Sequence, residues 1–287
     1  MTEGFLNLLK PPGMTSHDVI GAVRRIFGIK RVGHAGTLDP GAAGILPVAV
    51  GRAARLIEYL ADCDKADRTE LILGYATDTG DDTGKVVERR ENFRMPSEDE
   101  IREVLKRFTG RIRQVPPKYS AVKIGGKRAC DLARAAQEVE IPEREVEISR
   151  LELKEVRPGK LFLEAECSKG TYIRTLCADI GMALGIPATM GFLLRTRVGD
   201  FRLEDAVILE ELRERKEEAL LAPEACLSAL FRYDLPEHRK KAFCNGLSTN
   251  VKEEHLPKHF RVYCGEAFLG IGGYRSEEKS IIPIKVY

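Results

Sequence analysis

Hydrophobic positions in the first sixty residues follow two different periods. The short apolar run Phe5–Leu9 predicts a β-strand that ends at the stiff turn Lys10–Gly13. Apolar residues then recur at helical spacing behind the cap-forming side chains of Thr15–Asp18, which predicts a helix from Ser16 to Phe27. A second helix is predicted for Arg52–Leu60, whose apolar positions share one face.

The middle of the chain changes period several times. Leu71–Tyr75 predicts a strand, and Thr77–Gly84 predicts a polar, capped turn rather than a calcium loop, because no glutamate closes it at the twelfth place. Ser97–Phe108 predicts a helix, since Ser97 with Glu100 three residues later forms a capping box. A further helix is predicted for Arg128–Ala136.

A β-hairpin is predicted for Val146–Ser168, where apolar residues alternate on both sides of the break at Arg157–Lys160. Tyr172–Leu184 predicts a helix with one apolar face, and Leu203–Leu221 is predicted to be mostly helical and strongly charged. These segments, together with the earlier ones, predict an α+β fold.

The pattern becomes one of short strands after about Phe231. Strands are predicted for residues 260–264, 267–272 and 281–286, separated by turns. A chain of 287 residues is long for a single core, so we expect two domains. We place the first at residues 1–230 and a small β domain at residues 231–287.

One glycine-rich segment, residues 33–47, stands out from these patterns. It holds four glycines, two prolines and a single acid, Asp39, between Leu38 and Pro40. Glycine permits positive φ and close approach, and proline fixes φ, so we predict a shaped loop and neither helix nor strand. On composition alone a plain turn is the better interpretation, because Asp before Pro is a common turn opener.

Composition narrows the class of protein. No signal peptide or apolar span is visible, so we expect a cytoplasmic protein without a membrane segment. The seven cysteines are scattered without a CxxC pair and the five histidines are dispersed, so neither a disulfide framework nor a metal site is expected. There is no phosphate-binding glycine motif, and no cofactor is expected.

Charge is distributed unevenly although the net charge is only +2. Residues 111–134 contain seven basic side chains against the single acid Asp131, and a second basic group at residues 24–31 leads into the glycine-rich segment. Such patches could pair with the phosphates of a nucleic acid. An ordinary solvated surface is about as good an interpretation of either patch alone.

Four motifs together resemble the TruB family of tRNA pseudouridine synthases. They are KPPGMTSHD at residues 10–18, HAGTLDPGAAGILPVAVGRAARL from His34, QVPPKYSAVKIGGKRACDLAR at residues 114–134 and CSKGTYIRTLCADIG at residues 167–181. The resemblance implies the pseudouridine synthase fold, a mixed and largely antiparallel sheet flanked by helices. It also implies that the last segment is a short, β-barrel-like PUA domain that binds RNA.

The resemblance also implies a reaction and its residues. Uridine 55 in the T-loop of tRNA would be flipped out and isomerised to pseudouridine without a cofactor, by a protein expected to be a monomer. Asp39 would be the essential acid, Arg174 the guanidinium that keeps it ionised and aimed, and Tyr172 the ring beside the base. Three further residues are implied at the substrate: Leu193 in the base pocket, His34 in recognition of the flipped T-loop, and Lys10 as a support of the loop.

One position departs from the family pattern. Asp67 stands where the family carries a tyrosine that stacks on the target base, and a stacked ring contributes about 1–3 kcal/mol per base. A carboxylate cannot stack, so the alternative is a tRNA-binding or tRNA-folding protein with weak or lost catalysis. A synthase that acts within a ribonucleoprotein is less favoured, because the C-terminal segment is short. Whether Asp39 adds covalently or removes a sugar proton stays open.

Overall fold

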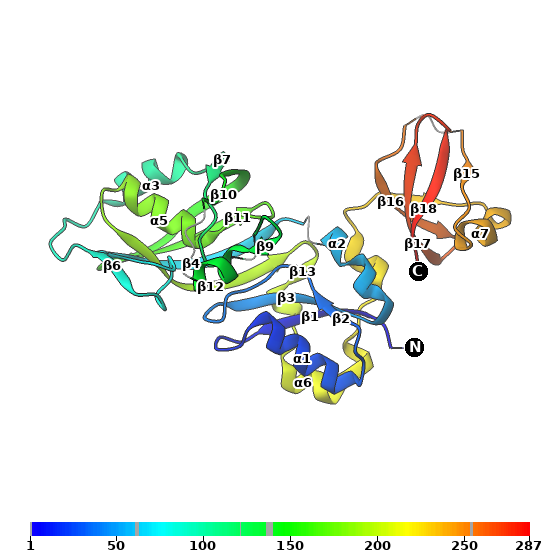
Figure 1. Cartoon of the computed structure of the whole chain (residues 1–287), viewed down its shortest axis with the longest axis horizontal. Helices are drawn as coiled ribbons and strands as arrows, with labels where there is room; N and C mark the ends of the chain where they lie inside the picture. The colour runs from blue at the N-terminus through cyan, green and yellow to red at the C-terminus, as the bar shows by residue number, and fades with distance from the viewer. Residues whose placement is uncertain (1, 61–62, 121, 136–139, 253–254) are drawn as a thin grey trace.

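The chain forms two β-rich bodies joined side by side (Figure 1). The structure is a computed structural model that describes residues 2–60, 63–120, 122–135, 140–252 and 255–287. The larger body holds a sheet with helices packed on it, and the smaller body, drawn in orange and red, holds the C-terminal strands.

The sheet of the larger body runs in the order β1-β3-β12-β4-β11-β10-β7 within the described residues. Its neighbours pair in antiparallel fashion except for β3 and β12, which are parallel. The strands are β1 (Gly4–Lys10), β3 (Ala43–Val50), β12 (Ala188–Val198), β4 (Lys65–Leu73), β11 (Lys160–Cys167), β10 (Arg144–Arg157) and β7 (Gly110–Gln114). Short strands β2 (Val32–His34) and β13 (Phe201–Arg202) pair with β3 and β12.

Three helices with local sequence signals form where they are predicted. Helix α1 (Ser16–Phe27) begins after Thr15, whose side chain completes a capping box with Asp18. Helix α3 (Glu98–Lys106) begins after Ser97, which forms the predicted capping box with Glu100. Helix α5 (Ile173–Ala183) begins after Tyr172. The predicted hairpin is also confirmed, as β10 and β11.

Three predictions of secondary structure are wrong in part. The glycine-rich segment, residues 33–47, is a loop only over residues 35–42, because Gly33 and His34 end β2 and Ala43–Val50 forms the fully buried strand β3. Residues 51–60 form the 3₁₀ helix η1 (Gly51–Leu56) followed by one turn of α2 (Ile57–Leu60). Residues 203–221 contain only η2 (Leu203–Asp205), α6 (Leu209–Arg215) and η3 (Lys216–Ala219), with breaks between η2 and α6 and after η3.

Strand β12 is absent from the sequence predictions although it lies in the middle of the sheet. It packs between β3 and β4 and is covered by α5. Its residues include Arg195 and Arg197, whose charges disguise the strand pattern. β12 therefore brings the C-terminal half of the larger body against the glycine-rich loop.

The basic segment that follows β7 has little regular structure. It contains the short hairpin β8 (Lys123–Ile124) and β9 (Lys127–Arg128), then α4 (Ala129–Arg134). The last residue of the predicted helix, Ala136, lies outside the described residues. A separate hairpin, β5 (Tyr75–Thr77) and β6 (Val86–Arg89), encloses the polar turn at residues 78–85.

The smaller body is a sheet in the order β14-β16-β17-β18-β15 with helix α7 (Glu237–Cys244) beside it. Its strands are β14 (Arg232–Asp234), β15 (Thr249–Asn250), β16 (His259–Cys264), β17 (Ala267–Arg275) and β18 (Ser280–Val286). It docks on η1 and α2: Lys285 Nζ lies 3.0 Å from Glu58, and Ile271 packs in one cluster with Leu56. The domain boundary at residue 230 stays a prediction.

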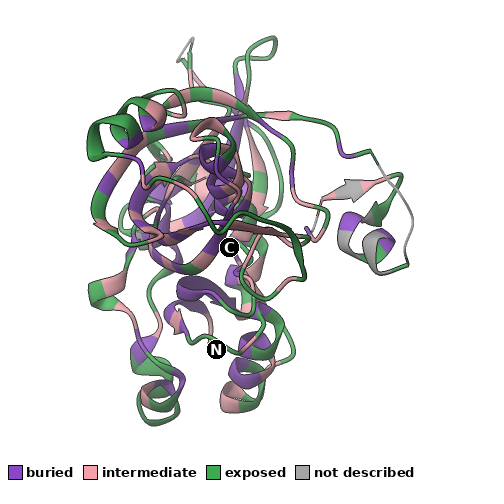
Figure 2. Cartoon of the chain, turned by 90° about the vertical axis from the view of Figure 1, so that its left-hand side faces the viewer, coloured by how far each residue is buried: buried purple, intermediate pink, exposed green. Residues whose placement is uncertain are grey.

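Buried residues concentrate inside the larger body (Figure 2). One hydrophobic cluster fills the space between the sheet and helices α3 and α5, and a second lies under α1 and α6. Leu38 of the glycine-rich loop belongs to the first cluster, which ties this loop to the main core.

Candidate active site

The loop that carries Asp39 spans residues 35–42, between β2 and β3, and is fixed from three sides. Ser16 Oγ exchanges hydrogen bonds with the backbone of Leu38, donating to its carbonyl at 3.1 Å and accepting from its N–H at 3.0 Å. The carbonyl of Pro40 accepts from Gly13 N at 2.8 Å and from Lys10 Nζ at 3.3 Å. The first turn of α1 and the end of β1 therefore hold both neighbours of Asp39.

Asp39 forms an ion pair with Arg174 at the start of α5. Arg174 Nε lies 3.0 Å from Oδ2, and Nη2 donates to Oδ1 at 3.3 Å, which is a two-point contact. The Arg174 side chain is only 5% exposed, whereas the Asp39 side chain keeps 35% of its surface open to solvent. The carboxylate is thus clamped on one side and accessible on the other.

Arg174 is itself held by two backbone carbonyls. Nη1 donates to Thr79 O at 3.0 Å, and Nη2 donates to Tyr119 O at 2.8 Å. Asp81 Oδ2 lies 3.9 Å from Nη1, so a second carboxylate faces the same guanidinium. Asp81 is absent from the predicted site residues, because the sequence around it is typical of a capped turn, and only the repeated acids of that turn indicate more.

The pKa of Asp39 depends on burial and on several charges besides that of Arg174. Burial raises the pKa of the Asp39 carboxyl above its ordinary value, and Arg174 offsets only part of this effect. Asp81 raises the same pKa further, while Arg195 and Lys65 lower it. Arg174 therefore favours the ionised form, as expected, but burial outweighs it.

Tyr172 is the residue that precedes α5, and its backbone is fixed by Gln114. Gln114 Oε1 accepts from Tyr172 N at 3.0 Å, and Gln114 Nε2 donates to Tyr172 O at 3.2 Å. The guanidinium of Arg144 lies 4.7 Å from the centre of the Tyr172 ring, a cation–π distance. The ring is half-buried, and it sits two residues from Arg174.

Lys10 is fully buried and acts on backbone. Its Nζ donates to Pro11 O at 2.9 Å, to Met14 O at 2.7 Å and to Pro40 O at 3.3 Å. Burial lowers the pKa of Lys10 to about 8, against an opposing effect of the Asp39 charge. Lys10 is therefore a tie between the turn after β1 and the loop of Asp39.

His34 and Leu193 occupy different surroundings. His34 ends β2 and is half-buried, and burial lowers the pKa of its imidazole. Leu193 on β12 is buried and belongs to the same hydrophobic cluster as Leu38. Leu193 is thus a core side chain, and whether it lines the base pocket stays a prediction.

Asp67 lies on β4 and has no exposed surface. Arg195 Nε donates to its Oδ1 at 3.2 Å, and Lys65 Nζ lies 3.1 Å from Oδ2 as an ion pair. These two cations lower the pKa of Asp67 in spite of its burial. Asp67 is thus a neutralised, sealed charge and faces no open space in this structure.

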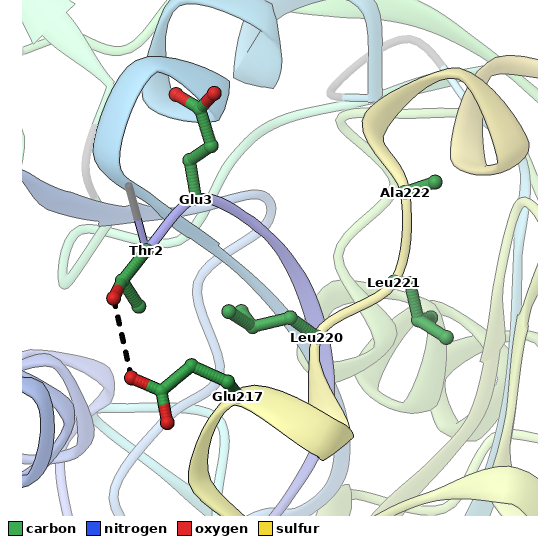
Figure 3. A pocket seen from close by; sticks show the side chains of 6 residues that line it. All are labelled: Thr2, Glu3, Glu217, Leu220, Leu221 and Ala222. Carbon is green, nitrogen blue, oxygen red and sulfur yellow. Dashed lines mark hydrogen bonds between the residues drawn. The ribbon is translucent and has the colours of Figure 1, made fainter.

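Among the residues that the structure describes, no three His, Cys, Asp or Glu side chains could hold a metal ion. No helix within those ranges is long and apolar enough to cross a membrane. A hollow near the N-terminus is lined by Thr2, Glu3, Glu217 and residues 220–222 (Figure 3), but its two carboxylates do not suit phosphate.

Comparison with known proteins identifies the family. Residues 24–173 match the TruB family pseudouridylate synthase (N terminal domain), and residues 174–230 match the tRNA pseudouridylate synthase B C-terminal domain. A tRNA pseudouridine synthase B of Heliobacterium modesticaldum is 49% identical over 293 residues, covering 99% of this chain and 95% of the relative. The corresponding protein of Alkaliphilus oremlandii is 42% identical over 292 residues, covering 99% and 97%.

Solved structures agree on the fold. The chain is similar to one in the crystal structure of a Cbf5-Nop10-Gar1 complex, with a TM-score of 0.76 and 26% identity over 100% of this chain and 84% of that one. The predicted α+β pseudouridine synthase fold is confirmed, and the small C-terminal sheet is compatible with a PUA-like domain. With most of its length matched and its relatives 40–50% identical, the chain belongs to the TruB family of pseudouridine synthases.

Proposed function

We propose that this chain converts uridine 55 in the T-loop of tRNA to pseudouridine. The single observation that carries the proposal is the Asp39–Arg174 pair, a carboxylate held at two points yet open on one side. The named activity of the relatives, tRNA pseudouridine synthase B, supports the same substrate. The proposal assigns Asp39 as the catalytic carboxylate.

The isomerisation breaks the bond between N1 of uracil and C1′ of the ribose and joins C5 to C1′. A proton leaves C5, and N1 finishes with a proton, so no atom is gained or lost. Asp39 acts in its ionised form, either by adding to the nucleoside or by removing a sugar proton. Arg174 keeps the carboxylate oriented, and this interaction strengthens once the bound nucleoside excludes water from the open side of Asp39.

Uridine must leave its stack to reach Asp39. We assign Tyr172 to the face of the flipped base, where its phenol assists proton transfer at C5, and Leu193 to the apolar wall behind the base. His34 directly precedes the loop of Asp39, and we assign it to recognition of the flipped T-loop of the RNA. An extruded base costs a few kcal/mol of unstacking, which such contacts offset in part.

RNA outside the T-loop is assigned to two further surfaces. The basic segment around Arg111 and Lys118 suits the phosphates of the T-arm stem. Helix α7 of the smaller body carries the basic residues Arg239, Lys240 and Lys241. We propose this helix as a second RNA contact. We propose that the chain acts on tRNA as a monomer in the cytoplasm.

The test is turnover on unmodified tRNA and on an isolated T-arm stem-loop. We expect the wild-type chain to convert the T-loop uridine, and Asp39→Ala to show no turnover while it still binds the RNA. Asp205→Ala, which changes an exposed acid of η2, is the matched control and should turn over normally. Turnover that survives in Asp39→Ala would show that another group is the catalytic acid.

The alternative is a tRNA-binding or tRNA-folding protein with weak or lost catalysis. It is motivated by Asp67 in place of a stacking ring. In the structure this carboxylate is sealed and paired with two cations, so it places no free negative charge beside Asp39. A wild-type chain that binds tRNA but leaves uridine unconverted would favour the alternative.

A further inference from the structure

Asp67 lies at a junction of three strands in the centre of the sheet. Its Cα pairs with Ala165 on β11 and with Arg195 on β12. The side chain has no exposed surface, and the partners Lys65 and Arg195 are 14% and 6% exposed. A carboxylate this deep is stable only when it is paired, because an uncompensated buried charge is strongly disfavoured.

Each cation that pairs with Asp67 also reaches a segment of the candidate active site. Arg195 Nη1 lies 3.5 Å from the carbonyl oxygens of both Gly36 and Thr37, in the loop that presents Asp39. Lys65 Nζ donates to the carbonyl of Thr171 at 2.9 Å. Thr171 directly precedes Tyr172, and Arg174 follows two residues later.

Two glycines allow this close approach: Gly36 in the loop and Gly44 at the start of β3. A Cβ on Gly36 would stand 3.4 Å from Arg195 Nη1, and a Cβ on Gly44 would stand 2.2 Å from the carbonyl oxygen of Arg195. Gly36 has φ +77° and Gly44 has φ +119°, conformations that favour glycine. The loop is thus shaped to rest against β12 where Arg195 is held.

From this geometry we infer that Asp67 is a positioning residue for the isomerisation, a buried joint that aligns the loop of Asp39 with the segment of Tyr172 and Arg174. The inference rests on the proposed function. Asp67 holds Arg195 toward one segment and Lys65 toward the other. It also balances their charges, so that Arg174 remains the dominant partner of Asp39.

This role differs from that of a stacking ring. The Asp67 side chain has no exposed surface, so no open space lies in front of it for a stacked base. A tyrosine at this position would remove the carboxylate that Lys65 and Arg195 share among the described residues, leaving two largely buried cations without this counter-charge. In this chain Asp67 therefore acts on the active site through Lys65 and Arg195 and does not contact the base.

The test compares Asp67→Asn with Glu164→Gln. Glu164 is the matched control because it is also largely buried, sits on the adjacent strand β11 and pairs with two cations, Arg68 at 2.7 Å and Arg150 at 2.6 Å. Side chains alternate along a strand, and Glu164 pairs with Arg68 rather than Asp67, so it points to the opposite face. Both substitutions keep shape and remove one charge.

We expect Asp67→Asn to slow single-turnover conversion of T-arm uridine by about 10- to 100-fold, the effect of a small misplacement of reacting groups. RNA affinity should change by less than about threefold, because the loss lies in alignment and not in binding. Hydrogen exchange should quicken in residues 36–39 and in residues 171–174. Glu164→Gln should leave the rate and the exchange of both segments unchanged.

The inference would be overturned if Asp67→Asn showed the same conversion rate and the same hydrogen exchange as Glu164→Gln. It would also be overturned if an Asp67→Tyr variant turned over faster than wild type. A wild-type chain without turnover would refute the proposed function alone. Hydrogen exchange would then still test the positioning role of Asp67. Faster exchange of residues 36–39 and 171–174 in Asp67→Asn would support that role, and unchanged exchange would overturn it.

Discussion

Two aspartate–arginine pairs lie close together in this molecule and differ mainly in how far they are open to solvent. Asp39 meets Arg174 at 3.0 Å, and Asp67 meets Arg195 at 3.2 Å. The Asp39 side chain is 35% exposed, and the Asp67 side chain is not exposed at all. The same two residue types thus form one pair that a substrate can approach and one that it cannot.

The pKa values of the two acids move in opposite directions. Burial raises the pKa of Asp39 because Arg174 offsets only part of the cost, whereas Lys65 and Arg195 together lower the pKa of Asp67 although it is more deeply buried. Asp67 contacts two cations directly, whereas Asp39 contacts Arg174 and is also raised in pKa by the nearby charge of Asp81. A carboxylate that is open to solvent and only partly compensated therefore suits chemistry, and one that is sealed and paired with two cations suits alignment.

Removal of Arg195 should have the largest effect on stability. Arg195→Met leaves Asp67 with Lys65 alone, and breaking a buried pair in this way typically costs about 3–5 kcal/mol of the free energy of unfolding. Urea-induced unfolding measures the loss. Arg174→Met should cost less, because Asp39 can turn toward water; equal losses for the two variants would remove the distinction between the pairs.

Removal of Arg174 should have the larger effect on turnover. Arg174→Met frees Asp39 and leaves the carbonyls of Thr79 and Tyr119 without their donor, so we expect conversion of T-loop uridine to fall at least about 100-fold. Single-turnover kinetics at saturating enzyme measure it. Arg174→Lys keeps the charge but cannot make the two-point contact, and near-normal turnover of that variant would contradict the geometry.

Local signals explain which parts of the fold could be predicted. Helices α1 and α3 follow from capping boxes within four residues, and the hairpin of β10 and β11 follows from alternation around one break. Strand β12 escaped because Arg195 and Arg197 look like surface residues. Their partners, Asp67 and Glu166, lie 128 and 31 residues away, beyond the reach of any local pattern.

The candidate site shows the same limit. Composition alone predicts a plain turn at Asp39. Only the family resemblance implies that Asp39 pairs with Arg174, which lies 135 residues away. Neither revealed that Asp81 faces Arg174 or that Asp67 is sealed. Charges that meet only in the tertiary structure cannot be read from spacing.

The opposite pKa shifts predict opposite effects of neutralising the two acids. A raised folded-state pKa means that ionised Asp39 destabilises the fold at neutral pH, so Asp39→Asn should be more stable than wild type there, with the gain disappearing as pH falls below the unfolded value. A lowered pKa means that ionised Asp67 stabilises the fold above its unfolded pKa, and this stability is lost as pH falls through the folded value. Asp67→Asn should therefore be less stable than wild type at neutral pH.

Unfolding in urea at neutral and acidic pH measures both differences. Turnover supplies a separate check, because Asp39 must be ionised: the acidic limb of the rate profile should lie above the ordinary range of an aspartate. Asp39→Asn and Asp67→Asn variants that change stability in the same direction would contradict the comparison.

The smallest effect is expected for a pair at the exposed end of this series. Glu211 and Arg215 lie 2.7 Å apart on consecutive turns of α6, and their side chains are 42% and 44% exposed. Water screens such a pair, and i,i+4 pairs contribute about 0.3–0.5 kcal/mol, so Glu211→Gln should change the free energy of unfolding by no more than that and leave turnover unchanged. Added salt should erase the difference in this variant while preserving the loss in Arg195→Met, because screening reaches exposed charges far more than buried ones. A loss in Glu211→Gln as large as that in Arg195→Met would mean that burial does not govern what these ion pairs contribute.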